Sequence, residues 1–198
     1  MKLAIILLAA GSSSRMGRSK QLLDINGESL LLRAARTALQ SGIGPVTVVL
    51  GAREVDHRKI IQHLDVTLVS NPTWELGMGS SLKAGLSHWV SMAPQSEGVM
   101  VILCDQPLLT AEYLKRLADS FYQSGKPIAA SRYGGSSGVP AVFSHSLFGE
   151  ILRLADDQGA KKIIAMHPEQ THYLDFKEGA IDIDTQEDYE RFVSRFRP

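Results

Sequence analysis

The chain begins with an uninterrupted apolar run, residues 3–10, that ends at Gly11. A run without polar residues at alternate positions is typical of a β-strand that is buried on both faces. Strands of this kind form parallel sheets with helices on both sides, because a parallel strand is reached through a crossover connection that is usually helical. This feature therefore favours an α/β fold around a parallel sheet.

The rest of the chain alternates between strand-like and helix-like segments. Further strands are expected at residues 46–50, 66–69, 99–104, 128–132, 141–143 and 180–183. Helical spacing predicts helices near residues 30–39, 54–64, 80–92, 111–124, 147–154, 160–166 and from 185 to 196. This alternation predicts a three-layer, Rossmann-like α/β domain with a mostly parallel central sheet, and ligands at the carboxyl ends of its strands. We expect residues 1–198 to form a single domain, in which 134–170 form a sub-lobe because the glycine-rich stretch 133–140 interrupts the alternation.

Length and charge exclude several classes of protein. A chain of 198 residues buries about 70% of its unfolded surface, so its core requires neither disulfides nor a structural metal. The 21 basic residues balance the 21 acidic ones, which leaves no long-range field to attract nucleic acid or an anionic membrane. The lone cysteine, Cys104, agrees with a reducing compartment. Arg15, Arg18 and Lys20 follow the first apolar run where a signal-peptide cleavage site should lie, so we expect a cytoplasmic protein.

The loop after the first strand is the most informative segment for chemistry. It contains Gly11, three serines, and the cations Arg15, Arg18 and Lys20. Small residues let backbone N–H groups approach an anion, and the cations supply charge for polyphosphate oxygens. The spacing disfavours a Walker P-loop, because five residues separate Gly11 from Gly17 and an arginine follows the second glycine. The alternative is a solvated, serine-rich loop with ordinary surface cations.

Two carboxylates follow expected strands. Asp105 ends the apolar strand in the middle of the chain, and Asp184 ends the expected last strand. Side chains delivered to one sheet edge could hold Mg²⁺, which binds a few carboxylates together with substrate phosphates. Asp182 would share the face of Asp184 and is a rival for the same role. The alternatives are a turn that Asp105 initiates with Pro107, and a cap that Asp184 supplies to the last helix.

Two other glycine-bearing segments match known motifs only in part. Residues 71–82 lead into a helix, yet Leu82 stands at the third glycine position of the dinucleotide fingerprint, and Ser80 could simply cap the helix. Residues 134–138 read G-x-S-x-G, but an extended Val-Pro pair follows where a nucleophile elbow requires a helix. A dehydrogenase and a serine hydrolase are therefore disfavoured.

Taken together and in order, these segments resemble the nucleotidyltransferases that attach a nucleotide to molybdopterin. That family lies within a larger group that activates sugars and isoprenoid precursors. The resemblance spans nearly the whole chain through residues 8–23, 71–85, 103–109, 138–143 with 157–161, and 182–189. Gln186 is a departure, since a proline is common at that position in the family.

The resemblance implies a role for each motif. It implies Arg15, Lys20 and Asp105 as catalytic residues, and Asp105 with Asp184 as ligands of Mg²⁺ or Mn²⁺. It implies that the nucleotide is bound by Leu8, Ala9, Ala10, Gly11, Arg15, Lys20, Gly79, Ser80 and Ser81. It implies that the acceptor is bound by Gly138, Pro140, Gln158, Gly159 and Lys161.

The first motif also suggests the nucleotide. Leu-Ala-Ala-Gly at residues 8–11 looks like the cytidine-selecting branch, since guanosine users carry a glycine at the position of Ala10. The implied reaction is transfer of CMP from CTP to the terminal phosphate of molybdopterin, the molybdenum cofactor, with release of pyrophosphate. A recipient molybdoenzyme or its chaperone is the implied partner. The alternatives are GTP as donor, a sugar phosphate or methylerythritol phosphate as acceptor, and a non-catalytic carrier of the cofactor.

Overall fold

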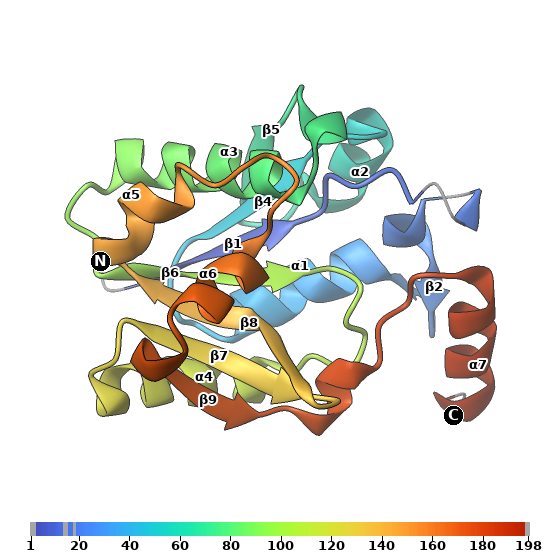
Figure 1. Cartoon of the computed structure of the whole chain (residues 1–198). Helices are drawn as coiled ribbons and strands as arrows, with labels where there is room; N and C mark the ends of the chain where they lie inside the picture. The colour runs from blue at the N-terminus through green and yellow to red at the C-terminus, as the bar shows by residue number, and fades with distance from the viewer. Residues whose placement is uncertain (1–2, 14–15, 18, 197–198) are drawn as a thin grey trace.

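The computed structural model describes residues 3–13, 16–17 and 19–196, and its centre is a seven-stranded sheet (Figure 1). The spatial order of the strands is β5-β4-β1-β6-β8-β7-β9, and β8 alone runs antiparallel to its neighbours. The strands are β1 (Leu3–Leu8), β4 (Val46–Leu50), β5 (Thr67–Ser70), β6 (Gly98–Leu103), β7 (Ile128–Tyr133), β8 (Ser136–Ser144) and β9 (Thr171–Asp175).

Helices cover both faces of this sheet (Figure 1). On one face pack α1 (Leu30–Gln40), α2 (Glu54–Ile61) and α4 (Ala111–Ser124). On the other face pack α3 (Met78–Met92), α5 (Phe148–Ile151) and α6 (Ala160–Met166). Strand β1 shows why both faces are covered, since Leu3, Ile5 and Leu7 enter one apolar cluster and the residues between them enter the other. The expectation of a three-layer α/β fold with a mostly parallel sheet is confirmed.

The C-terminal helix α7 (Gln186–Phe196) packs away from the sheet, beside the small hairpin of β2 (Asp24–Ile25) and β3 (Glu28–Ser29) (Figure 1). A third apolar cluster joins the two, and its buried members are Leu23, Ile25, Leu30, Ile183 and Phe192. The Tyr189 hydroxyl also donates to the Asp24 carbonyl at 2.7 Å. These contacts fix the chain that leads into α7.

The prediction of a last strand at residues 180–183 is wrong. These residues form the end of a short 3-10 turn (Lys177–Ala180) and an extended stretch outside the strands of the described chain. The alternation of Ile181 and Ile183 serves the cluster under α7 and not a sheet. The edge position belongs to β9, which pairs in parallel with β7 and which the sequence analysis missed.

The order of the strands determines where loops can meet. The chain moves outward from β1 to β4 and β5, and then returns to β6 on the opposite side of β1. Ligand crevices form at such switch points, where neighbouring connections leave the sheet in opposite directions. Leu8 at the end of β1 lies in register with Leu103 at the end of β6. The loop after β1 and the turn that holds Asp105 therefore start side by side.

Residues 134–170 contribute both to the sheet and to its cover. They supply β8, which lies between β6 and β7, and the helices α5 and α6. A sub-lobe that binds an acceptor stays a prediction.

Within the described part of the chain, none of the helices has both the length and the apolar character that a membrane span requires.

Candidate functional site

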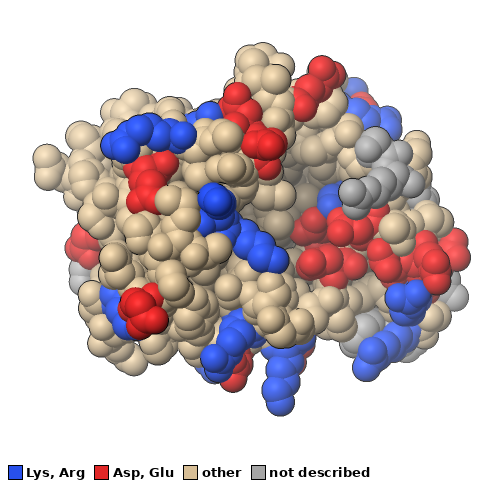
Figure 2. All heavy atoms as spheres, viewed as in Figure 1, with Lys and Arg blue, Asp and Glu red and all other residues tan. Residues whose placement is uncertain are grey.

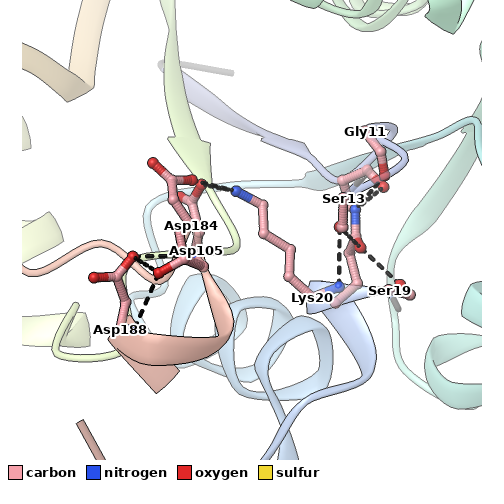
Figure 3. Close-up of polar contacts among 10 residues, drawn as sticks. Gly11, Ser13, Ser19, Lys20, Asp105, Asp184 and Asp188 are labelled. Carbon is pink, nitrogen blue, oxygen red and sulfur yellow. Dashed lines mark hydrogen bonds and ion pairs between the residues drawn. The ribbon is translucent and has the colours of Figure 1, made fainter. Parts of the chain in front are cut away.

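Three charged side chains from distant parts of the chain meet at the carboxyl ends of β1 and β6 (Figure 3). Lys20 Nζ lies 2.6 Å from Asp105 Oδ2 and 3.0 Å from Asp184 Oδ1. The side chains of Lys20 and Asp105 are 17% and 14% exposed, whereas that of Asp184 is 52% exposed. The ammonium group is thus partly enclosed, with a solvent-facing carboxylate on its outer side.

Asp184 reaches this position through a loop that is tied to the β6 turn. The backbone N–H of Ile183 donates to the carbonyl of Asp105 at 3.1 Å. The next residues form a reciprocal cap for α7: Thr185 N–H and Oγ1 donate to Asp188 Oδ2, and Asp188 N–H donates back to Thr185 Oγ1. Thr185 and Asp188 therefore make the cap that the sequence analysis offered as an alternative role for Asp184.

The cluster carries more negative charge than Lys20 neutralises. Burial alone would lower the pKa of Lys20, but the nearby Asp105 and Asp184 carboxylates raise it above its ordinary value. Partial desolvation and the negative charges of Asp105 and Asp184 raise the pKa of Asp182 to about 6. Asp105 Oδ1 is buried and has no hydrogen-bond partner among the described residues. The arrangement is suited to a further cation.

A cavity of about 310 Å³ opens beside these residues, and Figure 2 shows the hollow with acidic side chains gathered along one side. The predicted nucleotide-binding residues that line it are Leu8, Ala9, Ala10, Gly11, Lys20 and Ser81. Asp105 lines it as well. Arg15, predicted to bind phosphate, lies outside the described residues.

Two other predicted nucleotide-binding residues have packing contacts beneath the loop that precedes α3. Ser80 is buried, and its hydroxyl donates to the carbonyl of Gly77, one turn earlier. Helix α3 begins at Met78, so Ser80 lies inside the helix and is not its cap. A Cβ added at Gly79 would meet the carbonyls of Ala155 and Gln158. Nucleotide binding by Gly79 and Ser80 stays a prediction.

The wall of the cavity opposite β6 depends on a glycine at the end of β4. A Cβ added at Gly51 would lie 2.6 Å from Trp74 Cβ and 2.9 Å from Ala10 Cβ. Separations below about 3 Å essentially never occur for real Cβ atoms. The absence of a side chain at Gly51 therefore lets Trp74 approach the loop between β1 and Lys20, called the β1 loop below. Trp74 and Ala10 both line the cavity.

The segment predicted to bind the acceptor lies against the same site at two points. Gly77, which has φ of +126°, packs where a Cβ would lie 2.6 Å from the Asp156 carbonyl, and a Cβ at Gly159 would lie 2.7 Å from Met78 Sδ. Met78 lines the cavity, so the loop of Gln158 and Gly159 borders it, and Lys161 follows in α6.

The second contact joins β8 to the turn after β6. Gln106, directly after Asp105, donates through Nε2 to the Val139 carbonyl at 3.2 Å, and the Tyr133 hydroxyl donates to the same oxygen at 3.0 Å. Val139 stands between Gly138 and Pro140. The predicted acceptor residues of β8 are therefore anchored to the residue that follows Asp105.

Gln21 is a site residue that the sequence analysis did not single out. Its side chain is 1% exposed and lines the cavity, and its Nε2 donates to the carbonyls of Ala9 and Gly11 at 3.3 and 2.7 Å. The only sequence signal is a polar residue directly after the cationic loop, which does not distinguish a buried amide from an exposed one.

Comparison with known proteins identifies the family to which this fold and site belong. Residues 5–172 match the family described as the MobA-like NTP transferase domain. The chain belongs to that family. This nucleotidyltransferase is 28% identical to the purine catabolism protein PucB of Bacillus subtilis (strain 168), with 93% of each chain covered. It is 31% identical to the nicotine blue oxidoreductase of Paenarthrobacter nicotinovorans, with 95% of each covered.

Proteins named as molybdenum cofactor nucleotidyltransferases are also similar to this transferase. The molybdenum cofactor cytidylyltransferase of Escherichia coli (strain K12) is 25% identical over 93% of this chain and 92% of that protein. Among solved structures, Rv0371c of Mycobacterium tuberculosis H37Rv in complex with manganese is 27% identical, with a TM-score of 0.79 and coverage of 98% and 99%.

Proposed function

We propose that this nucleotidyltransferase transfers CMP from CTP to the terminal phosphate of molybdopterin, forming molybdopterin cytosine dinucleotide and pyrophosphate. The observation that carries the proposal is the meeting of Lys20, Asp105 and Asp184 beside the cavity of the β1 loop. The cytidylyltransferase among its relatives supports the choice of reaction. A cytoplasmic location, with delivery to a molybdoenzyme or its chaperone, belongs to the same proposal.

The carboxylates fit a divalent cation, Mg²⁺ or Mn²⁺. Asp105 Oδ1 is a buried oxygen without a partner among the described residues, and Asp184 lies across the same ammonium group. In the described chain no group of three or more His, Cys, Asp or Glu side chains is placed to hold a metal. Mg²⁺ characteristically uses one or two carboxylates and takes its other ligands from water and substrate phosphates. When bound by Asp105 and Asp184, the cation would offset charge on the triphosphate.

The chain's own residues then orient the two substrates. The β1 loop encloses the nucleotide, and Lys20 donates to the triphosphate where it now donates to the aspartates. We assign the acceptor to Gly138 of β8, next to the Val139 carbonyl that accepts from Gln106, and to the Gln158 loop, which packs against Gly79. A terminal phosphate oxygen of the acceptor attacks the α-phosphorus of CTP while the bond from that phosphorus to pyrophosphate breaks. Catalysis of this kind rests on positioning and electrostatic stabilisation.

This reaction does not require a general base. A phosphomonoester has its second pKa near 6, so the attacking oxygen is already anionic around neutral pH. None of the described residues that line the cavity is a histidine, and His57, whose Nε2 lies 2.7 Å from Ser19 Oγ, is fully buried.

The preference for CTP rests on the first motif and on the cavity wall. Ala10 has a methyl group at the position where family members that use guanosine nucleotides carry a glycine. In this protein the methyl group of Ala10 lies close to Gly51 and Trp74. A pyrimidine requires less space than a purine in such a walled cavity. GTP, or a sugar phosphate or methylerythritol phosphate as acceptor, is the alternative within the same chemistry. A carrier without catalysis would need neither the carboxylate pair nor the cationic loop.

A pyrophosphate-release assay tests donor, acceptor and metal together. CTP, GTP, ATP and UTP are each combined with molybdenum cofactor, with and without Mg²⁺, and parallel reactions contain a sugar phosphate or methylerythritol phosphate. The proposal predicts release with CTP and molybdenum cofactor only when the metal is present. Release with another pair would reassign the substrates, and cofactor binding without release from any triphosphate would indicate a carrier.

A further inference from the structure

A buried hydrogen-bond network lies beneath the β1 loop and includes a histidine from α2. His57 is 0% exposed, and its Nε2 lies 2.7 Å from Ser19 Oγ. Ser19, which is 4% exposed, lies 2.7 Å from Gln21 Oε1. Ser13 Oγ also donates to Gln21 Oε1, at 3.0 Å, and accepts from the backbone N–H of Lys20 at 2.9 Å. Gly11, Ser13 and Ser19 group around the backbone end of Lys20, away from the aspartates (Figure 3).

The direction of each hydrogen bond follows from the Gln21 amide. Its NH₂ group faces two carbonyl oxygens, those of Ala9 and Gly11, which can only accept. Gln21 Oε1 must therefore be the acceptor for Ser19, and the Ser19 hydroxyl uses its single proton for that bond. Ser19 Oγ can then only accept from His57, which requires a proton on Nε2.

The rest of the histidine ring agrees with this assignment. His57 Nδ1 is buried and has no partner among the described residues. A proton on Nδ1 would therefore be a buried donor without an acceptor, which costs about 1–3 kcal/mol. Burial and the nearby positive charge of Arg53 lower the pKa of His57, and Asp56 only partly opposes them. The ring is neutral at physiological pH.

The same directions exclude a nucleophilic Ser-His pair. An activated serine donates its proton to the histidine, whereas Ser19 donates to Gln21 and accepts from His57. Neither side chain has the exposure that a substrate would need.

We propose that His57 is a positioning residue: as a neutral Nε2–H donor it orients Ser19, which orients Gln21, and Gln21 and Ser13 together fix the loop backbone that carries Lys20. The chain of contacts runs from α2 to the backbone N–H of Lys20, whose side chain reaches Asp105. The proposal deepens the proposed function, on which it rests only for the importance of Lys20. The network itself is independent of any substrate.

The first test is the protonation state of His57 in the unmodified protein. Two-dimensional ¹H–¹⁵N correlation spectra of the histidine rings at neutral pH distinguish the Nε2–H tautomer, the Nδ1–H tautomer and the charged ring. The proposal predicts the neutral Nε2–H form for His57. Either of the other two forms would overturn it.

The second test is amide hydrogen exchange, in matched variants, of Lys20, Leu22 and Leu23, whose N–H groups donate to Ser13 Oγ and to the carbonyls of Ser19 and Lys20 respectively. His57→Leu removes the donor and should speed exchange roughly 10-fold, the factor for losing one buried hydrogen bond. His57→Gln places a side-chain N–H near the Nε2 position and should restore most of the protection. Ser19→Ala breaks the relay with His57 intact and should match His57→Leu. His63→Leu, at an exposed histidine just beyond α2, is the control and should change nothing.

These measurements need no nucleotide, so they stand apart from the proposed reaction. Unchanged exchange of the three amides in both His57→Leu and Ser19→Ala would overturn the positioning role. Should His57→Leu fail to fold, Ser19→Ala and the spectrum of the unmodified protein still decide the matter. If the protein shows the predicted spectrum and exchange but releases no pyrophosphate, the positioning role of His57 is supported and the proposed function is rejected.

Discussion

Lys20 is the residue on which the candidate site is centred. Its ammonium group pairs with two carboxylates from segments that are 85 and 164 residues away in the chain. The two aspartates raise its pKa, so the group is charged at any physiological pH. A triphosphate can replace the aspartates as partner of this ammonium, since phosphate oxygens are strong acceptors for charged donors.

Replacing Lys20 by alanine should weaken CTP binding and slow the chemical step. The variant leaves Asp105 and Asp184 facing one another without their cation, which adds repulsion against the triphosphate. Calorimetric titration with CTP and single-turnover rates would measure both effects. Normal affinity together with a normal rate would return Lys20 to the role of an ordinary surface cation.

Asp105→Asn should lower turnover by roughly 10²–10³, or about 3–4 kcal/mol, the scale for losing one electrostatic stabiliser. The substitution keeps the shape of the side chain but removes the charge next to Lys20. Initial rates of pyrophosphate release measure the effect, and Asp119→Asn, at an exposed position of α4, is the matched control. A folded Asp105→Asn protein with full turnover would exclude the role given to Asp105.

His57 should make stability sensitive to mild acid. Its pKa is lowered in the folded state by burial and by Arg53, so the unfolded chain takes up a proton that the folded chain does not. The free energy of unfolding should therefore fall below about pH 6.5, by at most about 1.4 kcal/mol per pH unit for this one group. Urea unfolding at several pH values should show a shallower fall in His57→Gln. Identical pH dependence in the two proteins would mean that His57 titrates normally in the fold.

Among the secondary-structure elements, β4 shapes the cavity through Gly51, the residue after its end, which packs against the lining residues Trp74 and Ala10. Gly51→Ala forces a methyl group to within 2.6 Å of Trp74 Cβ, and overpacking of this kind typically costs about 1–3 kcal/mol. The displaced Trp74 should also change CTP affinity, which titration would show alongside urea unfolding. Gly149→Ala in α5, where the new Cβ meets only the end of the Arg153 side chain, is the control. Equal stability and affinity in the two variants would contradict this account of the wall.

Elements with local signals were predictable from the sequence. Helix α4 has the predicted bounds, because its amphipathic pattern follows Thr110, whose hydroxyl accepts from Tyr113 N–H, and stops before a glycine in the left-handed conformation, Gly125. Strand β4 also has the predicted bounds, because four of its five residues are apolar and Gly51 follows its last residue. Strand β9 was missed because an edge strand such as Thr171–Asp175 is only half-buried and has no apolar run.

In the whole molecule, the change in direction of the strand connections between β1 and β6 brings residues 8–23 and residues 103–109 together. That meeting could be anticipated from two apolar strands that end in chemical residues, because parallel strands deliver their carboxyl ends to one edge. The position of Asp184 was anticipated for the wrong reason: a loop held by Ile183 and α7, and not a strand, carries it there. The link from His57 to Ser19 could not be anticipated, since it joins residues 38 positions apart through packing of α2.

The proposed reaction requires Lys20, Asp105 and Asp184 to surround a metal-bound CTP whose α-phosphorus is transferred to molybdopterin. The most direct measurement is pyrophosphate release from CTP in the presence of molybdenum cofactor, with Mg²⁺ and with excess chelator, for the unmodified protein and for Asp105→Asn. This reaction predicts pyrophosphate release with Mg²⁺, little release with chelator, and a large loss of release in Asp105→Asn. Equal release in all of these reactions, or none with any triphosphate and acceptor, would contradict it.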